Sequence, residues 1–377
     1  MKITHIGSIL MKPMPWVLVK VETDEGITGI GEAYHGAGVH QIVVDPRLQA
    51  ALIGQDPRNV DKLFRDMMQR MSASGFYQGA VMSAISGIES ALWDITGQAL
   101  GTPIWQLLGG KFRDKIRLYN DCHAGESETV DAYVAKAKEV EALGFSALKF
   151  DIDPLPSRRD RYNRSISNDD IAYYVEVVTA VRQALHRNTD LAIDAHWSYA
   201  PVDILKVAHA FESLNLLWLE DPIPPENVAA MVKVTQATTT PICTGENFYT
   251  RHGFREIIEK QGADIISPDL AKAGGLLEGR RIADLADLYY IPVAPHNIGS
   301  PIETIATCHV MAAVPNFLAL EFHHLHNPVW ENLLDGPPLI EDGHISVPNR
   351  PGLGVVLNED TLRANMKENL GFFDNKS

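Results

Sequence analysis

The chain has 377 residues, of which 45% are hydrophobic and 21% are charged, as in a globular protein with two domains or one large, elaborated domain. Its net charge of −15 would repel nucleic acid and anionic membrane surfaces, so we expect neither as a partner. The chain has no apolar run of the about 18 residues that a membrane span needs, and its N-terminus lacks a signal-peptide pattern, so we expect a soluble, cytoplasmic protein.

The N-terminal third of the chain combines strand and helix patterns. Residues 17–22 alternate apolar and polar side chains, residues 24–26 supply a turn, and residues 27–32 resume the extended pattern, which predicts a β-hairpin. From about residue 56 to 108, apolar side chains recur at three- and four-residue steps, the spacing of an amphipathic helix. We therefore predict a small α+β domain over residues 1–112.

After Gly109-Gly110, short apolar runs alternate with helical stretches. The eight predicted strands are residues 116–120, 147–151, 191–194, 216–220, 242–246, 264–267, 291–294 and 317–321. This repetition predicts a parallel TIM-type (β/α)₈ barrel over residues 113–348. The absence of a Gly-rich loop after the first strand argues against a dinucleotide-binding domain. Residues 349–377 contain no further barrel strand, and we expect them to return to the first domain.

Three carboxylates stand at the ends of successive predicted strands. Asp194, Glu220 and Glu246 are separated by 26 residues each, about one strand–helix unit. In a closed barrel these ends are neighbours, so the three side chains would converge and repel one another unless a cation lay between them. A single acid at such a position is more often a helix cap or a surface ion-pair partner. Three at equal spacing favour a hard cation such as Mg²⁺.

The next two strand ends carry Asp269 and His296, 27 residues apart. A carboxylate beside a histidine fixes its tautomer and raises its basicity, which suits a general base. Glu321, at the end of the eighth strand, would either hydrogen-bond the charge that grows on a substrate oxygen or close the ring of polar groups.

The opposite side of the predicted barrel offers a second set of polar groups. Lys149 and Asp151 point the same way from the second strand. Lys149 can balance a carboxylate, whereas Asp151 is either a weak second base or a group that orients Lys149. His196, two residues after Asp194, is a candidate general acid, although a structural histidine beside Trp197 is a comparable interpretation.

These residues, in this order, resemble the enolase superfamily and, within it, the mandelate racemase subgroup, with most similarity to acid-sugar dehydratases. The resemblance covers nearly the whole chain, because VKVETDEGITGIGEA and SAISGIESALWDITGQALGTPIWQLLGG resemble the family's capping domain. It implies an α+β cap on a modified barrel and a homo-oligomer of two to eight subunits. It also implies one Mg²⁺ per subunit on Asp194, Glu220 and Glu246, a base dyad of Asp269 and His296, and Glu321 as an acidic hydrogen-bond donor.

Substrate-binding residues are expected on the loops around the barrel mouth. The resemblance places Trp16, Tyr34, His35, Phe76 and Tyr77 on the two capping loops. The Arg-rich stretch after the second strand adds Arg158 and Tyr162, although a solvated loop is an equally simple interpretation of it.

The chain departs from the family pattern at one informative position. Related racemases often carry Lys-x-Lys on the second strand, whereas this chain has Lys149-Phe150-Asp151. Racemisation needs acid–base groups on both faces of the α-carbon, so the missing lysine favours a one-base reaction. We expect dehydration of a sugar acid, with His296 removing the C2 proton and His196 or His296 protonating the departing C3 hydroxyl. The alternative is a racemase, epimerase or cycloisomerase of a hydroxy or sugar acid, in which Asp151 or a loop residue is the second base.

Overall fold

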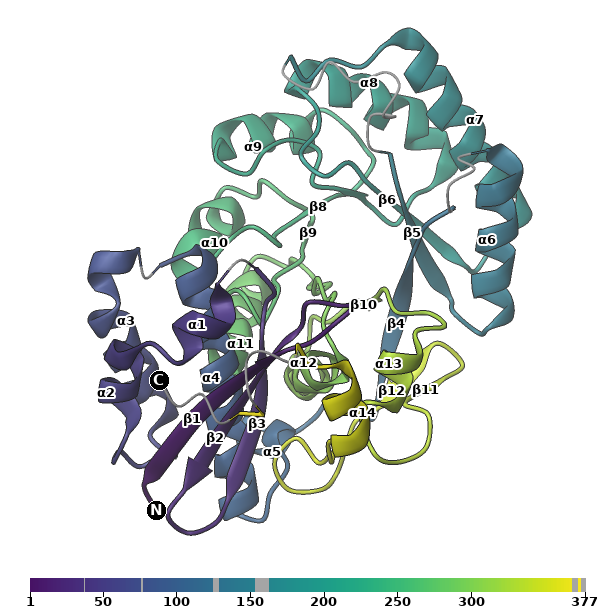
Figure 1. Ribbon diagram of the computed structural model, residues 1–377. Coiled ribbons are helices and arrows are strands. Elements are labelled where there is room, and N and C mark those ends of the chain that lie inside the picture. The colour runs from purple at the N-terminus through teal and green to yellow at the C-terminus, as the bar shows by residue number, and fades with distance from the viewer. Residues whose placement is uncertain (37, 76, 125–128, 153–162, 368–371, 374–377) are drawn as a thin grey trace.

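The computed structural model describes residues 1–36, 38–75, 77–124, 129–152, 163–367 and 372–373 (Figure 1). Its N-terminal part contains an antiparallel sheet in the order β1 (Ile3–Leu10), β2 (Val17–Thr23) and β3 (Thr28–Ala33). Strands β2 and β3 form the predicted hairpin, with Val17 opposite Ala33. Strand β1 adds a third, antiparallel member to this hairpin.

Helices cover this sheet and complete the N-terminal part. They are α1 (Val39–Val43), α2 (Pro46–Leu52), α3 (Val60–Arg70), α4 (Gly79–Ala99) and α5 (Ile104–Leu107). Helix α4 lies so close to β3 that a Cβ on Gly29 or Gly31 would lie 2.1 or 2.2 Å from a backbone oxygen of the helix. Most side chains of α4 are buried on all sides of the helix and not only along one face. The reason is that β3, α1, α3 and α11 all contact this helix.

The larger part of the chain is a closed parallel barrel, as predicted. Its strands are β4 (Lys115–Cys122), β5 (Ala147–Asp151), β6 (Asp190–Asp194), β7 (Leu219–Glu220), β8 (Ile242–Thr244), β9 (Ile265–Ile266) and β10 (Leu320–Phe322). Strands β4 to β9 pair in chain order, and β10 pairs with β4. Val293 bridges Ile266 and Phe317 and so closes the ring. The predicted strand at residues 291–294 is reduced to these bridges, because the prolines flanking Val293 and Ala294 have no N–H to donate.

Helices surround the barrel, as Figure 1 shows for α6 to α10. Their bounds are α6 (Val130–Ala142), α7 (Asn168–Ala184), α8 (Pro201–Phe211), α9 (Val228–Gln236), α10 (Thr250–Glu259), α11 (Leu276–Asp287), α12 (Pro301–Ala313) and α13 (Pro328–Asn332). Every residue of α12 is buried, since this helix contacts both the barrel and β3. No helix among the described residues is both long and apolar enough to cross a membrane.

A small layer of side chains fills the inside of the barrel below its mouth. Small residues such as Ala147, Ala192 and Cys243 leave room for Tyr119 and Trp218, whose rings meet edge to face at 5.1 Å. The barrel is therefore a packed core and not a pore, and polar side chains gather only where the strands end.

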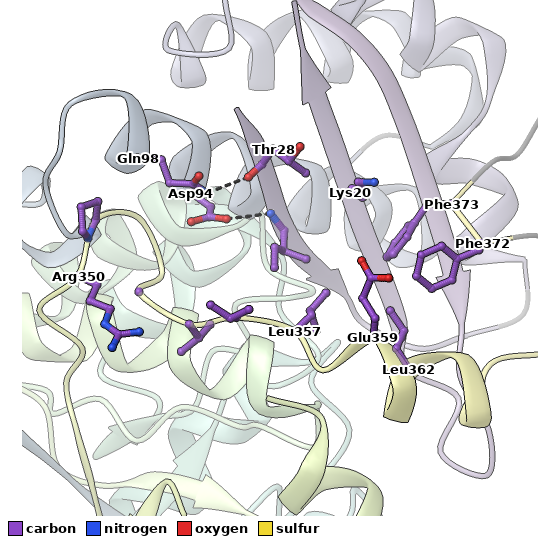
Figure 2. Close-up of a pocket in the computed structure, with 15 residues that line it drawn as sticks. Lys20, Thr28, Asp94, Gln98, Arg350, Leu357, Glu359, Leu362, Phe372 and Phe373 are labelled. Atoms are coloured by element: carbon purple, nitrogen blue, oxygen red, sulfur yellow. Dashed lines mark hydrogen bonds between the residues drawn. The ribbon is translucent and has the colours of Figure 1, made fainter. Parts of the chain in front are cut away.

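The last part of the chain returns to the N-terminal sheet. It comprises β11 (Ile340–Glu341), β12 (His344–Ser346), which pairs with β4, and α14 (Glu359–Asn365). Met366 then bridges to Met11 after β1. Figure 2 shows Leu357, Leu362 and Phe373 beside β2 and β3, around a cavity of about 480 Å³. The domain limits at residues 112 and 348 stay a prediction.

Asp94 of α4 fastens this returning segment. Its carboxylate accepts hydrogen bonds from the backbone N–H groups of Ile30 (2.9 Å) and Leu353 (2.8 Å), and it is 3% exposed. Figure 2 shows the bond to Ile30. One carboxylate thus connects a strand of the sheet, a helix and the C-terminal segment.

We expect Asp94→Ala to lower the free energy of unfolding by about 1–3 kcal/mol for each N–H that it leaves buried without a partner. Urea denaturation followed by circular dichroism measures the loss. The control is Asp114→Ala, which removes an exposed carboxylate paired with Lys111 and should cost much less. Equal stability of the two variants would contradict this role for Asp94.

Candidate active site

Lys149 lies at the centre of the polar groups at the barrel mouth. It comes from β5 and is 1% exposed. Its Nζ lies 2.7 Å from Glu321, 2.8 Å from Asp194, 3.0 Å from Glu220 and 3.3 Å from Asp121. Burial by itself would lower the pKa of Lys149, but the carboxylates outweigh it and raise that pKa well above its usual value. The side chain is therefore a fixed ammonium ion.

The three predicted metal ligands occupy neighbouring strand ends. Asp194 pairs in register with Glu220, and Glu246 follows β8, next to β7 in the ring. Lys149 lies between the first two carboxylates, and the Glu246 carboxylate lies 3.2 Å from Nε2 of His296. The ligand atoms of Asp194, Glu220 and Glu246 do not all lie within 4.8 Å of one another. Among the described residues, two other groups of three side chains have ligand atoms that close together: Asp151, Asp194 and His196, and Asp121, His123 and His323.

The chemistry of these carboxylates nevertheless fits a hard divalent cation. Glu220 Oε1 is buried and has no hydrogen-bond partner in the described part of the chain, while Oε2 accepts from Nε1 of Trp218 at 2.8 Å. Burial raises the pKa of Glu220 well above its usual value, with neighbouring carboxylates adding to the effect. An orphaned oxygen beside two further carboxylates is an oxygen-only donor set, which suits Mg²⁺.

His296 and Asp269 form the predicted dyad. Nδ1 of His296 donates to Oδ2 of Asp269 at 2.7 Å, which leaves Nε2 to face Glu246. Burial alone would lower the pKa of His296, but the charges of Glu246, Glu321 and Asp269 outweigh it and raise the pKa to about 10. Asp269 thus fixes the tautomer and the orientation of the ring, as a general base requires.

Glu321 differs from the expectation of an acidic hydrogen-bond donor. Its Oε2 accepts from the backbone N–H of Asn297 at 2.9 Å, and its Oε1 lies 2.7 Å from Lys149. Burial would raise the pKa of Glu321, but Lys149, His296 and His323 lower it well below its usual value. The contacts therefore favour an ionised Glu321 that accepts hydrogen bonds, and its role as a donor stays a prediction.

The opposite face carries Asp151 and His196 where a second lysine base could stand. Asp151 pairs in register with Asp194, and its Oδ1 lies 4.0 Å from Nδ1 of His196. Burial, with the charges of Asp121 and Asp194, raises the pKa of Asp151 to about 8. His196 is a third exposed on its side chain, and its backbone N–H donates to Asp194 at 2.9 Å.

Three residues that the sequence did not single out together complete this ring. Asp121 is the last residue but one of β4, two residues before His123, and Nε2 of His323 lies 3.3 Å from the Asp121 carboxylate. The Lys149 ammonium, also 3.3 Å from Asp121, already balances that charge, so we assign these groups to the same polar ring and not to a separate metal site. The sequence did contain a sign of this: Asp121 and His123 are two positions apart, as are Lys149 and Asp151 on the next strand.

The predicted substrate-binding residues lie in different surroundings. The ring of Tyr34 approaches the base, since its centroid lies 6.2 Å from that of His296. The ring of His35 stacks on that of Tyr34 with centroids 4.4 Å apart. Trp16 is 1% exposed and donates to the backbone oxygen of Ile298 at 3.2 Å, so its contacts are structural. Tyr77 is 53% exposed and faces His252. Phe76, Arg158 and Tyr162 lie outside the described residues.

Lys272 is a further charged group on the base side that the sequence did not reveal. It is 5% exposed, its Nζ lies 4.4 Å from the ring centroid of Tyr34, and it donates to Asn247 at 2.9 Å. The cap therefore contributes an aromatic ring, and the barrel a cation, beside His296. Only the fold brings residues 34 and 272 together.

Comparison with known proteins agrees with this geometry. Residues 132–361 match the family described as enolase C-terminal domain-like, and residues 4–109 match the mandelate racemase/muconate lactonizing enzyme N-terminal domain. The chain belongs to the enolase superfamily. The family and the cap-on-barrel fold predicted from the sequence are thus confirmed.

Superfamily members of known structure or name resemble the chain over nearly its whole length. A D-xylonate dehydratase of Haloferax volcanii is 46% identical, over 96% of this chain and 87% of its own. A D-galactonate dehydratase of Ralstonia pickettii is 34% identical, over 98% and 95%. A mandelate racemase/muconate lactonizing enzyme-like protein from Rubrobacter xylanophilus superposes with a TM-score of 0.94 at 41% identity, over 99% of each chain.

We expect Lys149→Met to destabilise the protein in the presence of a chelator, by about 3–5 kcal/mol, because it leaves buried carboxylates without their counter-charge. Chemical denaturation in EDTA measures the difference. Lys62→Met is the matched control, since Lys62 forms an exposed ion pair with Asp66. A Lys149 variant as stable as the Lys62 variant would show that the ammonium does not hold the ring together.

Proposed function

We propose that this protein is a Mg²⁺-dependent acid-sugar dehydratase. It would remove the proton next to a substrate carboxylate and eliminate the 3-hydroxyl to give a 2-keto-3-deoxy acid. The observation that carries the proposal is the asymmetry of the site: a His296–Asp269 base on one face, and Asp151 with His196 on the other. Relatives named as D-xylonate and D-galactonate dehydratases support the same reaction class.

In this proposal the His296 imidazole takes the C2 proton through Nε2. Nδ1 is already committed to Asp269, so the ring cannot rotate away, and the positive charge it gains lies beside a carboxylate. A cation held by Glu246 would offset the carboxylate that raises the pKa of His296 most, and would so leave Nε2 unprotonated and able to act as a base.

The charge that appears on the substrate carboxylate needs cations nearby. Lys149 supplies one fixed ammonium among Asp194, Glu220 and Glu321. Mg²⁺ held by Asp194, Glu220 and Glu246 would supply Lewis-acid stabilisation of the same negative charge. Each change of about 1.4 kcal/mol in the activation free energy changes the rate tenfold. Removal of a proton this weakly acidic would therefore require both the Lys149 ammonium and the metal ion.

His196 is the proposed acid for the departing 3-hydroxyl. It is part-exposed at the mouth, next to Asp151 and across the ring from His296. Asp151 would help to orient it, since the two side chains approach each other at 4.0 Å. His296 itself, protonated by the first step, is the alternative donor.

The second candidate is an epimerase or cycloisomerase of the same class of acids. It is favoured by one observation: burial and like charges raise the pKa of Asp151 to about 8, which brings an aspartate into the range of a general base. Proton exchange with inversion at C2 of the recovered substrate would distinguish it from dehydration.

We expect the protein, supplied with Mg²⁺ and a panel of five- and six-carbon aldonic acids, to form a 2-keto-3-deoxy acid that reacts with semicarbazide. In D₂O the product should carry deuterium at C3, because solvent protonates the enol that elimination leaves. Recovered substrate with deuterium and inverted configuration at C2, without a keto product, would favour the epimerase instead.

We expect Glu220→Gln to abolish both Mg²⁺ binding and turnover while leaving the fold intact, because the amide removes one of three ligand charges. Isothermal titration with Mg²⁺, the semicarbazide assay and circular dichroism are the measurements. Glu256→Gln, an exposed residue paired with Lys260, is the control and should bind Mg²⁺ normally. Full activity of the Glu220 variant would defeat the metal assignment.

A further inference from the structure

A buried glutamate, Glu303, lies behind the base dyad and has no part in the proposed chemistry so far. It is in the first turn of α12 and is 4% exposed. Its carboxyl group lies within hydrogen-bonding reach of the carboxyl group of Asp269 and of the backbone N–H of Ala271. The fold reserves space for it, since a Cβ on Gly299 would lie 1.9 Å from Glu303 Oε2.

Two carboxylates cannot hydrogen-bond to each other without a proton between them. Apart from each other, Oδ1 of Asp269 and Oε1 of Glu303 are both buried and have no donor among the described residues. Oδ2 of Asp269 is already committed to Nδ1 of His296. A proton on one of the two carboxyl groups satisfies both orphaned oxygens at once, whereas two ionised groups leave both oxygens unpaired and repelling.

Glu32 of the cap is the carboxyl group that receives the N–H groups at this helix end. Its carboxylate accepts from the backbone N–H and hydroxyl of Ser300, at 2.9 and 2.5 Å, and from the N–H of Glu303 at 3.1 Å. Such N–H groups at the start of α12 favour a negative charge. A second negative charge on Glu303, immediately behind Glu32 and Asp269, is correspondingly disfavoured.

Burial raises the pKa of Glu303 well above its usual value, and the charges of Asp269 and Glu32 raise it further. Tyr34, which follows β3, is the other titratable group acting in this cluster, and it feels the charges of both Asp269 and Glu303. The groups facing Glu303 from the cap and from the loop after β9 thus all disfavour its ionised form.

We propose that Glu303 is a protonated carboxylic acid that donates to Asp269 and so acts as the positioning residue of a His296–Asp269–Glu303 triad. The proton on Glu303 fixes the second oxygen of Asp269 while the first fixes the imidazole. Glu32 holds the start of α12 and therefore transmits the position of the cap to this triad. The expected effects on turnover rest on the proposed function, whereas the location of the proton on Glu303 does not depend on it.

The kinetic test compares two substitutions at Glu303. Glu303→Gln keeps a donor for Asp269, so kcat should stay within about threefold of the wild type, whereas Glu303→Met removes the donor and should lower kcat by about 10- to 100-fold. KM and Mg²⁺ affinity should change little in both, since Glu303 touches neither substrate nor a metal ligand. Equal kcat values for the two variants would overturn the proposal.

Glu89 provides the matched control for burial. It is 1% exposed and accepts a hydrogen bond from the backbone N–H of Leu276 at 2.7 Å. None of its hydrogen bonds among the described residues involves His296 or Asp269. The Gln and Met variants at position 89 should differ in melting temperature but not in kcat. A difference in kcat at 89 as large as at 303 would show that the effect is merely structural.

Infrared spectroscopy locates the proton without any turnover. The wild-type protein with Mg²⁺ should show a C=O band of a protonated carboxylic acid that shifts in D₂O and is missing from Glu303→Gln. No such band in the difference spectrum would overturn the proposal even if Glu303→Met fails to fold. If no acid sugar is dehydrated by the wild type, the proposed function fails, and the band still decides where the proton lies.

Discussion

The interaction on which the site depends is the contact of one buried ammonium with a ring of carboxylates. Lys149 reaches Asp121, Asp194, Glu220 and Glu321, each at the end of a different barrel strand. Charges of one sign at this density would drive the strand ends apart in a medium of low dielectric constant. The ammonium offsets part of that repulsion, and the remaining negative charge is what makes a divalent cation fit. The positions of the strand ends thus concentrate the negative charge that a cation would offset.

The cap is joined to the barrel by polar contacts as well as by apolar packing. Glu32 of β3 receives the first N–H groups of α12, and Glu89 of α4 receives those of α11 through Leu276. In both cases a carboxylate of the cap meets the start of a barrel helix, where free N–H groups and the helix dipole favour negative charge. These contacts hold the cap against the barrel.

The sequence predicted the features that depend on chain order. Equal spacing placed Asp194, Glu220 and Glu246 at adjacent strand ends, and the same rule paired Asp269 with His296. Proline chemistry explains the one weak element, residues 291–294, which keeps its place in the ring without forming a full strand. Strand order in a barrel follows chain order, so spacing along the chain becomes spacing in the ring.

What the sequence could not predict depends on the closure of the ring and on the cap. Asp121 and His323 meet because the last strand pairs with the first, and Lys272 meets Tyr34 because the cap lies over the mouth. Glu303 looked like one more helical glutamate, since no spacing rule links a residue of α12 to Asp269. Trp16 is buried and bonded to the backbone of Ile298, a contact that the sequence did not reveal, and its role in substrate binding stays a prediction.

The aromatic layer beneath the mouth constrains how this site can change over evolution. Trp218 donates to Glu220 and leans edge-on against Tyr119, so the residue that closes the barrel from below also orients a carboxylate at its mouth. Hollowing out this floor to admit a longer molecule would therefore disturb the charges above it. New specificity has to come from the rim, where loop residues can be exchanged while the acids and bases stay fixed.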